Sequence, residues 1–102
     1  MTKAKVLLVE DDRDVRAALG QALELAEYPV TLTGTFIEAT DHISPGFEGV
    51  IVTNIRMPRK DGMNLIARVQ SIDSELPVIV LTGEGDVPMA VEALGRGAYD
   101  FL

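Results

Sequence analysis

The feature that most constrains the fold is an alternation of short apolar runs with longer segments of helical periodicity. Three runs rich in β-branched residues occupy residues 6–9, 50–53 and 78–82, and each is apolar at nearly every position. This pattern is typical of strands covered on both faces, as in parallel sheets. We expect a fourth strand nearer an edge of the sheet over residues 30–33, and a last one over residues 98–102.

Between these strands, apolar residues recur at steps of three and four, as on one face of a helix. The pattern predicts helices over about residues 14–27, 36–43, 63–69 and 89–94, with Asp86 as a candidate N-cap of the last. Strand–helix alternation implies right-handed βαβ units and a parallel sheet. Five strands in so short a chain favour a doubly wound α/β fold with the flavodoxin-like order 2-1-3-4-5.

Length, charge and cysteine content narrow the function classes. The chain has 102 residues, enough for one domain, and a formal net charge of −7. Because it has no basic run, we expect no direct nucleic-acid binding by this domain. It has no cysteine, which excludes thiolate metal sites and disulfides. No apolar run is long enough for a signal peptide or a membrane span, so we expect a cytoplasmic protein without membrane contact.

Polar side chains follow three of the predicted strands. Glu10 and Asp11 come after the first strand, Asn54 after the third, and Thr82 ends the fourth. Because carboxyl ends of parallel strands meet at one edge, we expect these side chains to converge at the switch point between strands 1 and 3. Adjacent carboxylates repel each other unless a cation joins them, and oxygen ligands suit Mg²⁺ or Mn²⁺. We expect Asp12 instead to cap the following helix.

Signals for other chemistries are weak. His42 is the only histidine, and its polar neighbours indicate a surface position. No second histidine and no serine or cysteine nucleophile accompany it, so a hydrolase triad has no support. The chain also has neither GxxxxGK[ST] nor GxGxxG, the phosphate-binding fingerprints of nucleotide-binding folds. We therefore expect no enzyme of these kinds.

The polar segments together resemble the receiver (CheY-like) domains of two-component response regulators. The resemblance covers the whole chain and is carried by residues 9–12, 54–62 and 82–83. Residues 82–93 and 97–101 narrow it further. They resemble receivers of C4-dicarboxylate transport regulators, which act with sigma-54, and receivers of related nitrogen-fixation regulators.

The resemblance implies a mechanism. In this family a sensor histidine kinase donates a phosphoryl group to an aspartate at the end of strand 3, and Mg²⁺ joins the acids to that aspartate. Thr82 would then bind the phosphoryl group, and Phe101 would be the aromatic residue that changes position on activation. The implied metal ligands are Glu10, Asp11, Asn54 and the main-chain carbonyl of Arg56.

Two departures from the family pattern matter. Position 54 is asparagine where the acceptor aspartate is expected, and an amide is a poor nucleophile and a weaker metal ligand. We therefore expect no phosphorylation at Asn54. The intact surroundings favour an engineered change over a natural degenerate receiver. The family's lysine and last helix would follow Leu102, so residues 1–102 are expected to be a receiver truncated after strand 5.

The resemblance also implies partners. We expect a sensor histidine kinase, a transcriptional output module with sigma-54 ATPase and DNA-binding domains, and a possible homodimer. One alternative is a natural pseudo-receiver that acts only by binding other proteins. Another is a flavodoxin-like enzyme or cofactor carrier, which is the weakest because the acidic residues after strand 1 would repel a flavin phosphate.

Overall fold

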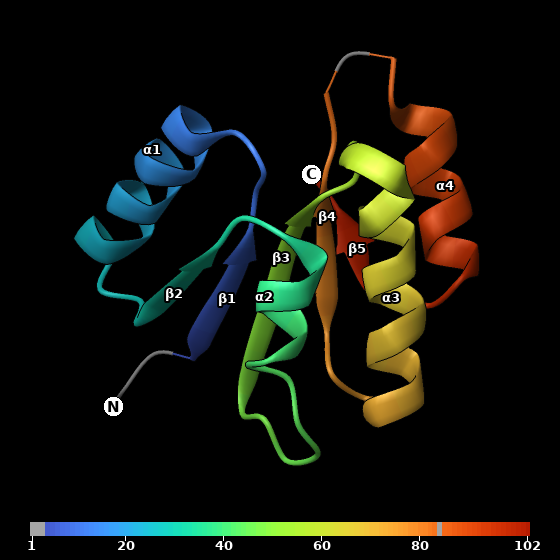
Figure 1. Ribbon diagram of the computed structural model, residues 1–102, viewed down its shortest axis with the longest axis horizontal. Helices are drawn as coiled ribbons and strands as arrows, with labels where there is room; N and C mark the ends of the chain where they lie inside the picture. The colour runs from blue at the N-terminus through green and yellow to red at the C-terminus, as the bar shows by residue number, and fades with distance from the viewer. Residues whose placement is uncertain (1–3, 84) are drawn as a thin grey trace.

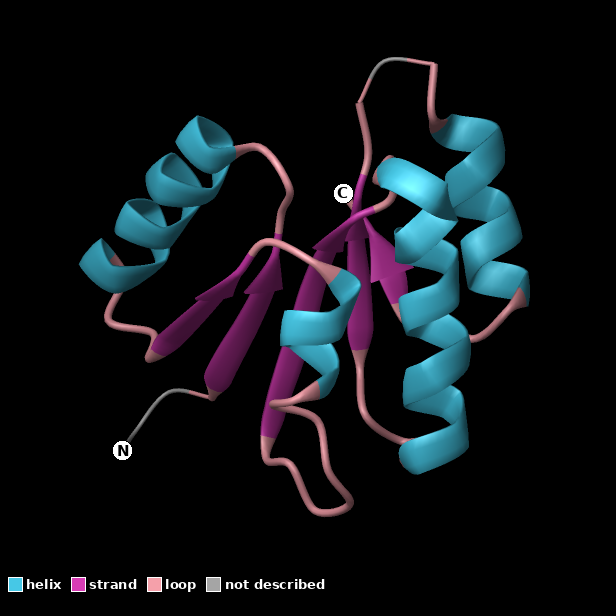
Figure 2. Cartoon of the chain, in the orientation of Figure 1, coloured by secondary structure: helices cyan, strands magenta, loops and turns pink. Residues whose placement is uncertain are grey.

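Five parallel strands form one sheet in the order β2-β1-β3-β4-β5 in the computed structural model, which describes residues 4–83 and 85–102. All the strand arrows in Figure 2 point the same way. The predicted strand order is therefore confirmed, although the last strand is shorter than the expected residues 98–102. The strands are β1 (Lys5–Val9), β2 (Val30–Thr33), β3 (Gly49–Asn54), β4 (Val78–Leu81) and β5 (Asp100–Phe101).

Three helices, α2, α3 and α4, lie together on one side of the sheet, whereas α1 lies apart beside β1 and β2 (Figure 1). The first helix was predicted to end at residue 27 but ends at Leu25, two residues earlier. The reason is that Glu27 has a φ of 69°, in the left-handed region, which a right-handed helix cannot contain. A short 3₁₀ turn, η1, was not predicted. The helical elements are α1 (Arg13–Leu25), α2 (Phe36–Thr40), η1 (Pro58–Lys60), α3 (Asp61–Ile72) and α4 (Val87–Gly95).

The helix starts agree only in part with the sequence-based expectations. Asp12 caps α1 as expected, since its Oδ1 accepts hydrogen bonds from the N–H groups of Asp14 and Val15 at 2.9 and 3.0 Å. Asp86 occupies the N-cap position of α4, but its side chain makes no hydrogen bond to that helix. The predicted N-cap position of Asp86 is therefore confirmed, but its carboxylate does not cap the helix and has other partners at the cleft described below.

The hydrophobic core lies between the sheet and the layer of α2, α3 and α4. Buried side chains from the strands, such as Leu7, Ile51 and Val80, pack there against buried side chains of α3, such as Leu65 and Ile66. The other face of the sheet carries α1 alone among the described helices. There an apolar groove of about 250 Å³ is lined by Leu8, Leu19, Ala22, Leu23, Val52, Leu81 and Leu102.

The groove corrects one expectation about the strands. β1 is buried at four consecutive positions, as predicted for a strand covered on both faces. In β3 and β4 buried and half-buried residues alternate, because the side chains facing the groove, such as Val52 and Leu81, are only partly covered. The prediction that β3 and β4 are covered on both faces is therefore wrong for the face that lines the groove.

The position of His42 and the length of the helices were also predicted. His42 is exposed as expected, although it lies in the turn after α2 and not within the helix. In the part of the chain that the structure describes, none of the helices has the length and apolar character needed to cross a bilayer.

Gly62 allows α3 to lie close beneath the end of β3. A Cβ atom at this position would lie 2.7 Å from the carbonyl oxygen of Ile55 and 2.9 Å from that of Asn54. We expect Gly62→Ala to lower the free energy of unfolding by about 1–3 kcal/mol through overpacking. Gly95→Ala is the matched control: no atom lies within 4 Å of its added Cβ. It should be neutral or stabilise α4 by up to ~1 kcal/mol. Urea unfolding measures both, and equal effects would contradict the close approach at Gly62.

Candidate functional site

A cleft of about 300 Å³ lies at the carboxyl ends of β1, β3 and β4. Because Val9 pairs with Thr53, Glu10, directly after β1, and Asn54, the last residue of β3, lie at the same level. The expected convergence is therefore observed for these two side chains and for Thr82. The cleft is lined by Glu10, Val15, Leu19, Asn54, Arg56, Leu81, Thr82, Gly83 and Asp86.

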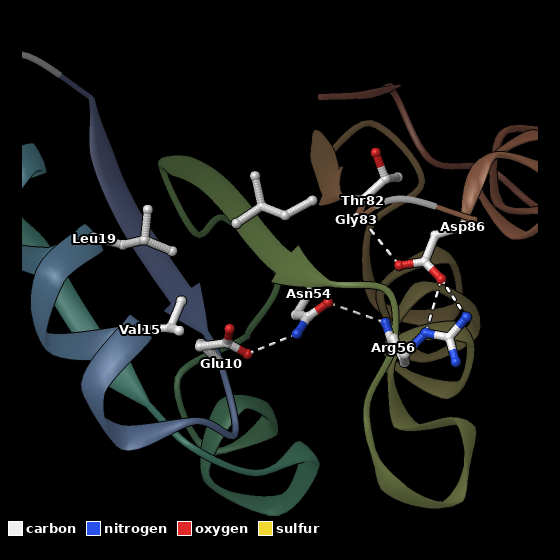
Figure 3. Close-up of a pocket in the computed structure, with 9 residues that line it drawn as sticks. Glu10, Val15, Leu19, Asn54, Arg56, Thr82, Gly83 and Asp86 are labelled. Atoms are coloured by element: carbon white, nitrogen blue, oxygen red, sulfur yellow. Dashed lines mark hydrogen bonds and ion pairs between the residues drawn. The ribbon is translucent and has the colours of Figure 1, made fainter.

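The Asn54 amide joins the two sides of the cleft. Its Nδ2 donates a hydrogen bond to Oε2 of Glu10 at 2.9 Å, and its Oδ1 accepts one from the main-chain N–H of Arg56 at 3.1 Å. Figure 3 shows the two bonds, which run from Glu10 through the Asn54 side chain to Arg56. The amide thus presents its donor to the acidic side of the cleft and keeps its oxygen turned toward the loop after β3.

Glu10 carries the charge that is hardest to accommodate. Glu10 is only 4% exposed to solvent. Burial raises the pKa of the Glu10 carboxyl, the neighbouring Asp11 carboxyl adds to the rise, and the hydrogen bond from Asn54 opposes it. Asp11 was expected to converge here as well, and this expectation is wrong: its side chain is exposed and does not line the cleft, because it points outward while Glu10 beside it is buried. Its carboxyl acts on the site through Glu10.

An ion pair that the sequence reading missed forms the opposite wall. Oδ1 of Asp86 accepts hydrogen bonds from Nε of Arg56 at 2.8 Å and from its Nη2, while Oδ2 accepts the N–H of Gly83 at 2.9 Å. Arg56 and the Gly83 N–H hold the pKa of Asp86 below its ordinary value, and Asp86 in turn raises the pKa of Arg56. Sequence spacing gave no signal for it, because the two residues lie 30 positions apart.

Thr82 and Phe101 reach the site less directly. Thr82 lines the cleft, but its hydroxyl donates to the carbonyl oxygen of Leu102 at 2.7 Å. In Figure 3 this hydroxyl points away from Asn54. Phe101 is partly buried against the hydrophobic core and does not line the cleft. The roles expected of the two residues stay predictions.

The carboxylates at this edge are too few for a complete metal cage, although their oxygens are of the kind that Mg²⁺ binds. In the described ranges, no cluster of three or more His, Cys, Asp or Glu side chains could hold a metal. Glu10 and Asp11 supply two carboxylates, which together with main-chain carbonyls and retained waters is a usual ligand set for Mg²⁺. The Asn54 oxygen is turned away toward the N–H of Arg56, so it could join this set only if the amide turned over.

The sequence of this chain is similar to a family of known proteins. Residues 6–102 match the family model described as the response regulator receiver domain. This chain belongs to the response regulator receiver family. The receiver is 45% identical over 97 residues to the C4-dicarboxylate transport transcriptional regulatory protein DctD of Rhizobium meliloti, covering 95% of this chain and 21% of that protein. It is 39% identical over 105 residues to the transcriptional regulatory protein FixJ of Bradyrhizobium diazoefficiens, covering 99% and 49% respectively.

Solved structures agree with this assignment. Full-length FixJ from B. japonicum superposes with a TM-score of 0.84 at 38% identity, over all of this receiver and half of that chain. NtrX from Brucella abortus superposes with a TM-score of 0.90 at 29% identity, over all of this receiver and 23% of that chain. The receiver thus spans from about a fifth to about half the length of these relatives. Two of them, DctD and FixJ, are transcriptional regulatory proteins by name.

The raised pKa of Glu10 predicts a pH-dependent stability. A carboxyl with a raised folded-state pKa favours the folded state at acid pH, and this contribution is lost as the pH rises through the folded pKa. At pH 7 the charged, buried Glu10 therefore costs stability, and Glu10→Gln should raise the urea midpoint there. The gain should shrink as the pH falls toward the ordinary glutamate pKa of about 4.3.

The exposed Glu48 provides the matched control for this measurement. Glu48→Gln should change the midpoint little at any pH between 4 and 8. A Glu10→Gln variant that is less stable than the parent at pH 7 would contradict the assigned cost of the buried charge.

Proposed function

We propose that this receiver is the input module of a transcriptional response regulator and that it is silent as a phosphoryl acceptor at position 54. The observation that carries the proposal is an asparagine amide at the centre of the acidic cleft, hydrogen-bonded at both ends. The partners we propose are a sensor histidine kinase and an output module with sigma-54 ATPase and DNA-binding domains. The proposed location is the cytoplasm.

Elementary chemistry supports the silence of position 54. Attack on phosphorus needs an electron-rich oxygen, and the neutral amide oxygen of Asn54 is a far weaker nucleophile than a carboxylate. This oxygen also accepts a hydrogen bond from the N–H of Arg56, which withdraws electron density from it. The group facing Glu10 is a donor, Nδ2, which carries no free lone pair to form a bond with phosphorus.

Mg²⁺ is the cofactor we propose for the acidic side of the cleft. Glu10 and Asp11 would hold it, with the Arg56 carbonyl and, after a turn of the amide, Oδ1 of Asn54 as further ligands. The bound cation supplies positive charge that offsets the repulsion between the carboxylates. In the orientation that the structure shows, the Asn54 amide donates to Glu10 and accepts from Arg56, so its Oδ1 would give up both bonds to become a ligand.

A specific observation keeps a second candidate function in view. In the described part of the receiver, no buried side-chain nitrogen or oxygen lacks a hydrogen-bond partner, and Asn54 contributes to this at both ends of its amide. A site so completed leaves no buried side-chain polar atom of the described residues that needs a phosphoryl group or a cation as its hydrogen-bond partner. It therefore suits a pseudo-receiver that signals by binding other proteins.

Restoring the acceptor separates the two candidates. Asn54→Asp should gain one phosphoryl group from acetyl phosphate with Mg²⁺, measured by intact-protein mass spectrometry, because the carboxylate becomes the nucleophile. Asn64→Asp makes the same chemical change at an exposed position of α3 and should gain none. No gain by Asn54→Asp, in a folded protein that binds Mg²⁺, would overturn the proposal that the amide at position 54 alone silences a phosphorylatable receiver, and would support the pseudo-receiver.

Removing one acid tests the metal site. Asp11→Asn should weaken Mg²⁺ binding on the order of tenfold or more, since direct ligands contribute at least as much as the partners that orient them. Isothermal titration calorimetry measures the affinity, and urea unfolding should show an intact or slightly stabilised fold because carboxylate repulsion is relieved. Asp14→Asn is a control in the first turn of α1 and should leave the affinity within about twofold. Equal affinity of Asp11→Asn and the parent would remove Asp11 from the ligand set.

A further inference from the structure

We infer that Arg16 is a positioning residue for the acidic side of the cleft. It holds the main chain between Glu10 and Asp11, and through this main chain it sets the place of the two carboxylates. The inference rests on the proposed function in one respect, because one of its tests uses the proposed cation, Mg²⁺. The contacts of Arg16 at the end of β1 carry the rest.

Arg16 reaches back from α1 to the last part of β1. Its Nη1 donates a hydrogen bond to the main-chain carbonyl oxygen of Glu10 at 2.9 Å. Its own main-chain N–H lies in the first turn of α1 and donates to the Asp12 carbonyl at 2.9 Å. The Glu10 carbonyl belongs to the peptide unit that leads to Asp11. The half-buried Arg16 therefore ties the start of α1 to the point where the chain leaves the sheet.

Glu10 is held from three elements at once. Its main-chain N–H donates to the carbonyl oxygen of Thr33, the last residue of β2, at 3.0 Å. Its carbonyl accepts from Arg16 of α1, and its Oε2 accepts from Asn54 of β3. Because the main chain is fixed on both sides of the Glu10 Cα, the direction of the carboxylate depends on these main-chain contacts as well as on Asn54. The contact from Arg16 comes from a side chain, so a substitution can remove it.

Gly34 leaves the room that the guanidinium occupies. A Cβ atom at this position, in the loop between β2 and α2, would lie 2.6 Å from Nη1 of Arg16 and 3.4 Å from its Cζ. The φ of Gly34 lies outside the left-handed region that favours glycine. The glycine is therefore explained by space and not by backbone conformation. An added methyl group there would move only the end of a flexible side chain.

Charge alone would give Arg16 the opposite effect on a cation. A guanidinium near the two carboxylates repels a cation bound to them, so loss of its charge should strengthen Mg²⁺ binding. A positioning role predicts weaker binding, because partners that orient metal ligands contribute about 10- to 100-fold to the affinity. The two explanations therefore differ in the sign of the change, and one titration separates them.

Isothermal titration calorimetry with magnesium chloride is the first test. Arg16→Met should weaken Mg²⁺ binding on the order of tenfold, although it removes a positive charge. Gly34→Ala keeps that charge and should weaken binding too, because its Cβ displaces the guanidinium. Arg16→Lys keeps the charge and a donor, and should recover part of the affinity. Arg13→Met is the control: it removes the charge of an exposed arginine at the first residue of α1 and should not weaken binding.

NMR on the metal-free receiver is the second test. In Arg16→Met and Gly34→Ala the Glu10 amide should exchange faster, on the order of tenfold for the loss of one hydrogen bond from a charged group. The side-chain NH₂ signals of Asn54 should shift, since their acceptor on Glu10 is no longer held in place. Amides of α3, such as those of Leu65 and Val69, should exchange as in the parent receiver. A general loss of stability would speed exchange in α3 as well.

The outcomes decide as follows. Unchanged exchange at Glu10 in both variants, or Mg²⁺ binding that is as tight as in the parent or tighter in both, would overturn the positioning role. Faster exchange that extends to Leu65 and Val69 would overturn it too. A parent receiver that binds no Mg²⁺ would count against the proposed cofactor, while the NMR signals of the metal-free variants still decide on Arg16.

Discussion

The pairing of β1 with β3 is the constraint on which the site depends. Val9 and Thr53 lie opposite each other in a parallel ladder, so Glu10 and Asn54 leave the sheet at the same level and side by side. A shift of one residue in this register would send alternate side chains to the other face and separate the two groups. The buried apolar side chains of β1 favour this register, because a slip of one residue would exchange the side chains of its two faces. The core of the receiver and its cleft therefore share one cause.

Much of the fold follows from the sequence because it depends on local patterns. Continuous apolar runs predict the parallel strands and their order, and Asp12 behaves as an ordinary helix cap. The short β5 and the half-covered faces of β3 and β4 were not predictable in the same way. How completely a strand is covered depends on which helices lie over it in three dimensions, and residue type alone does not report this.

The site divides along a similar line. Glu10, Asn54 and Thr82 were predicted to meet because each follows a strand, and the strand ends meet. The direction of each side chain was not predictable. Thr82 turns to Leu102, and Asp86, expected to cap α4, is held by Arg56 instead. These choices depend on competition between hydrogen-bond partners that are remote in sequence, and such competition is settled only when the loops are in place.

The amide of Asn54 has a consequence for how such a receiver can evolve. It fits between Glu10 and the N–H of Arg56 with both ends bonded, so the surrounding residues are stable around it as they stand. Asparagine and aspartate codons differ by a single base. Under the proposed function, the scaffold is therefore one point mutation away from a carboxylate at the acceptor position, with its strands, its loops and Glu10 already in place. A lineage that carries this asparagine could lose or regain a phosphorylation switch without rebuilding the domain.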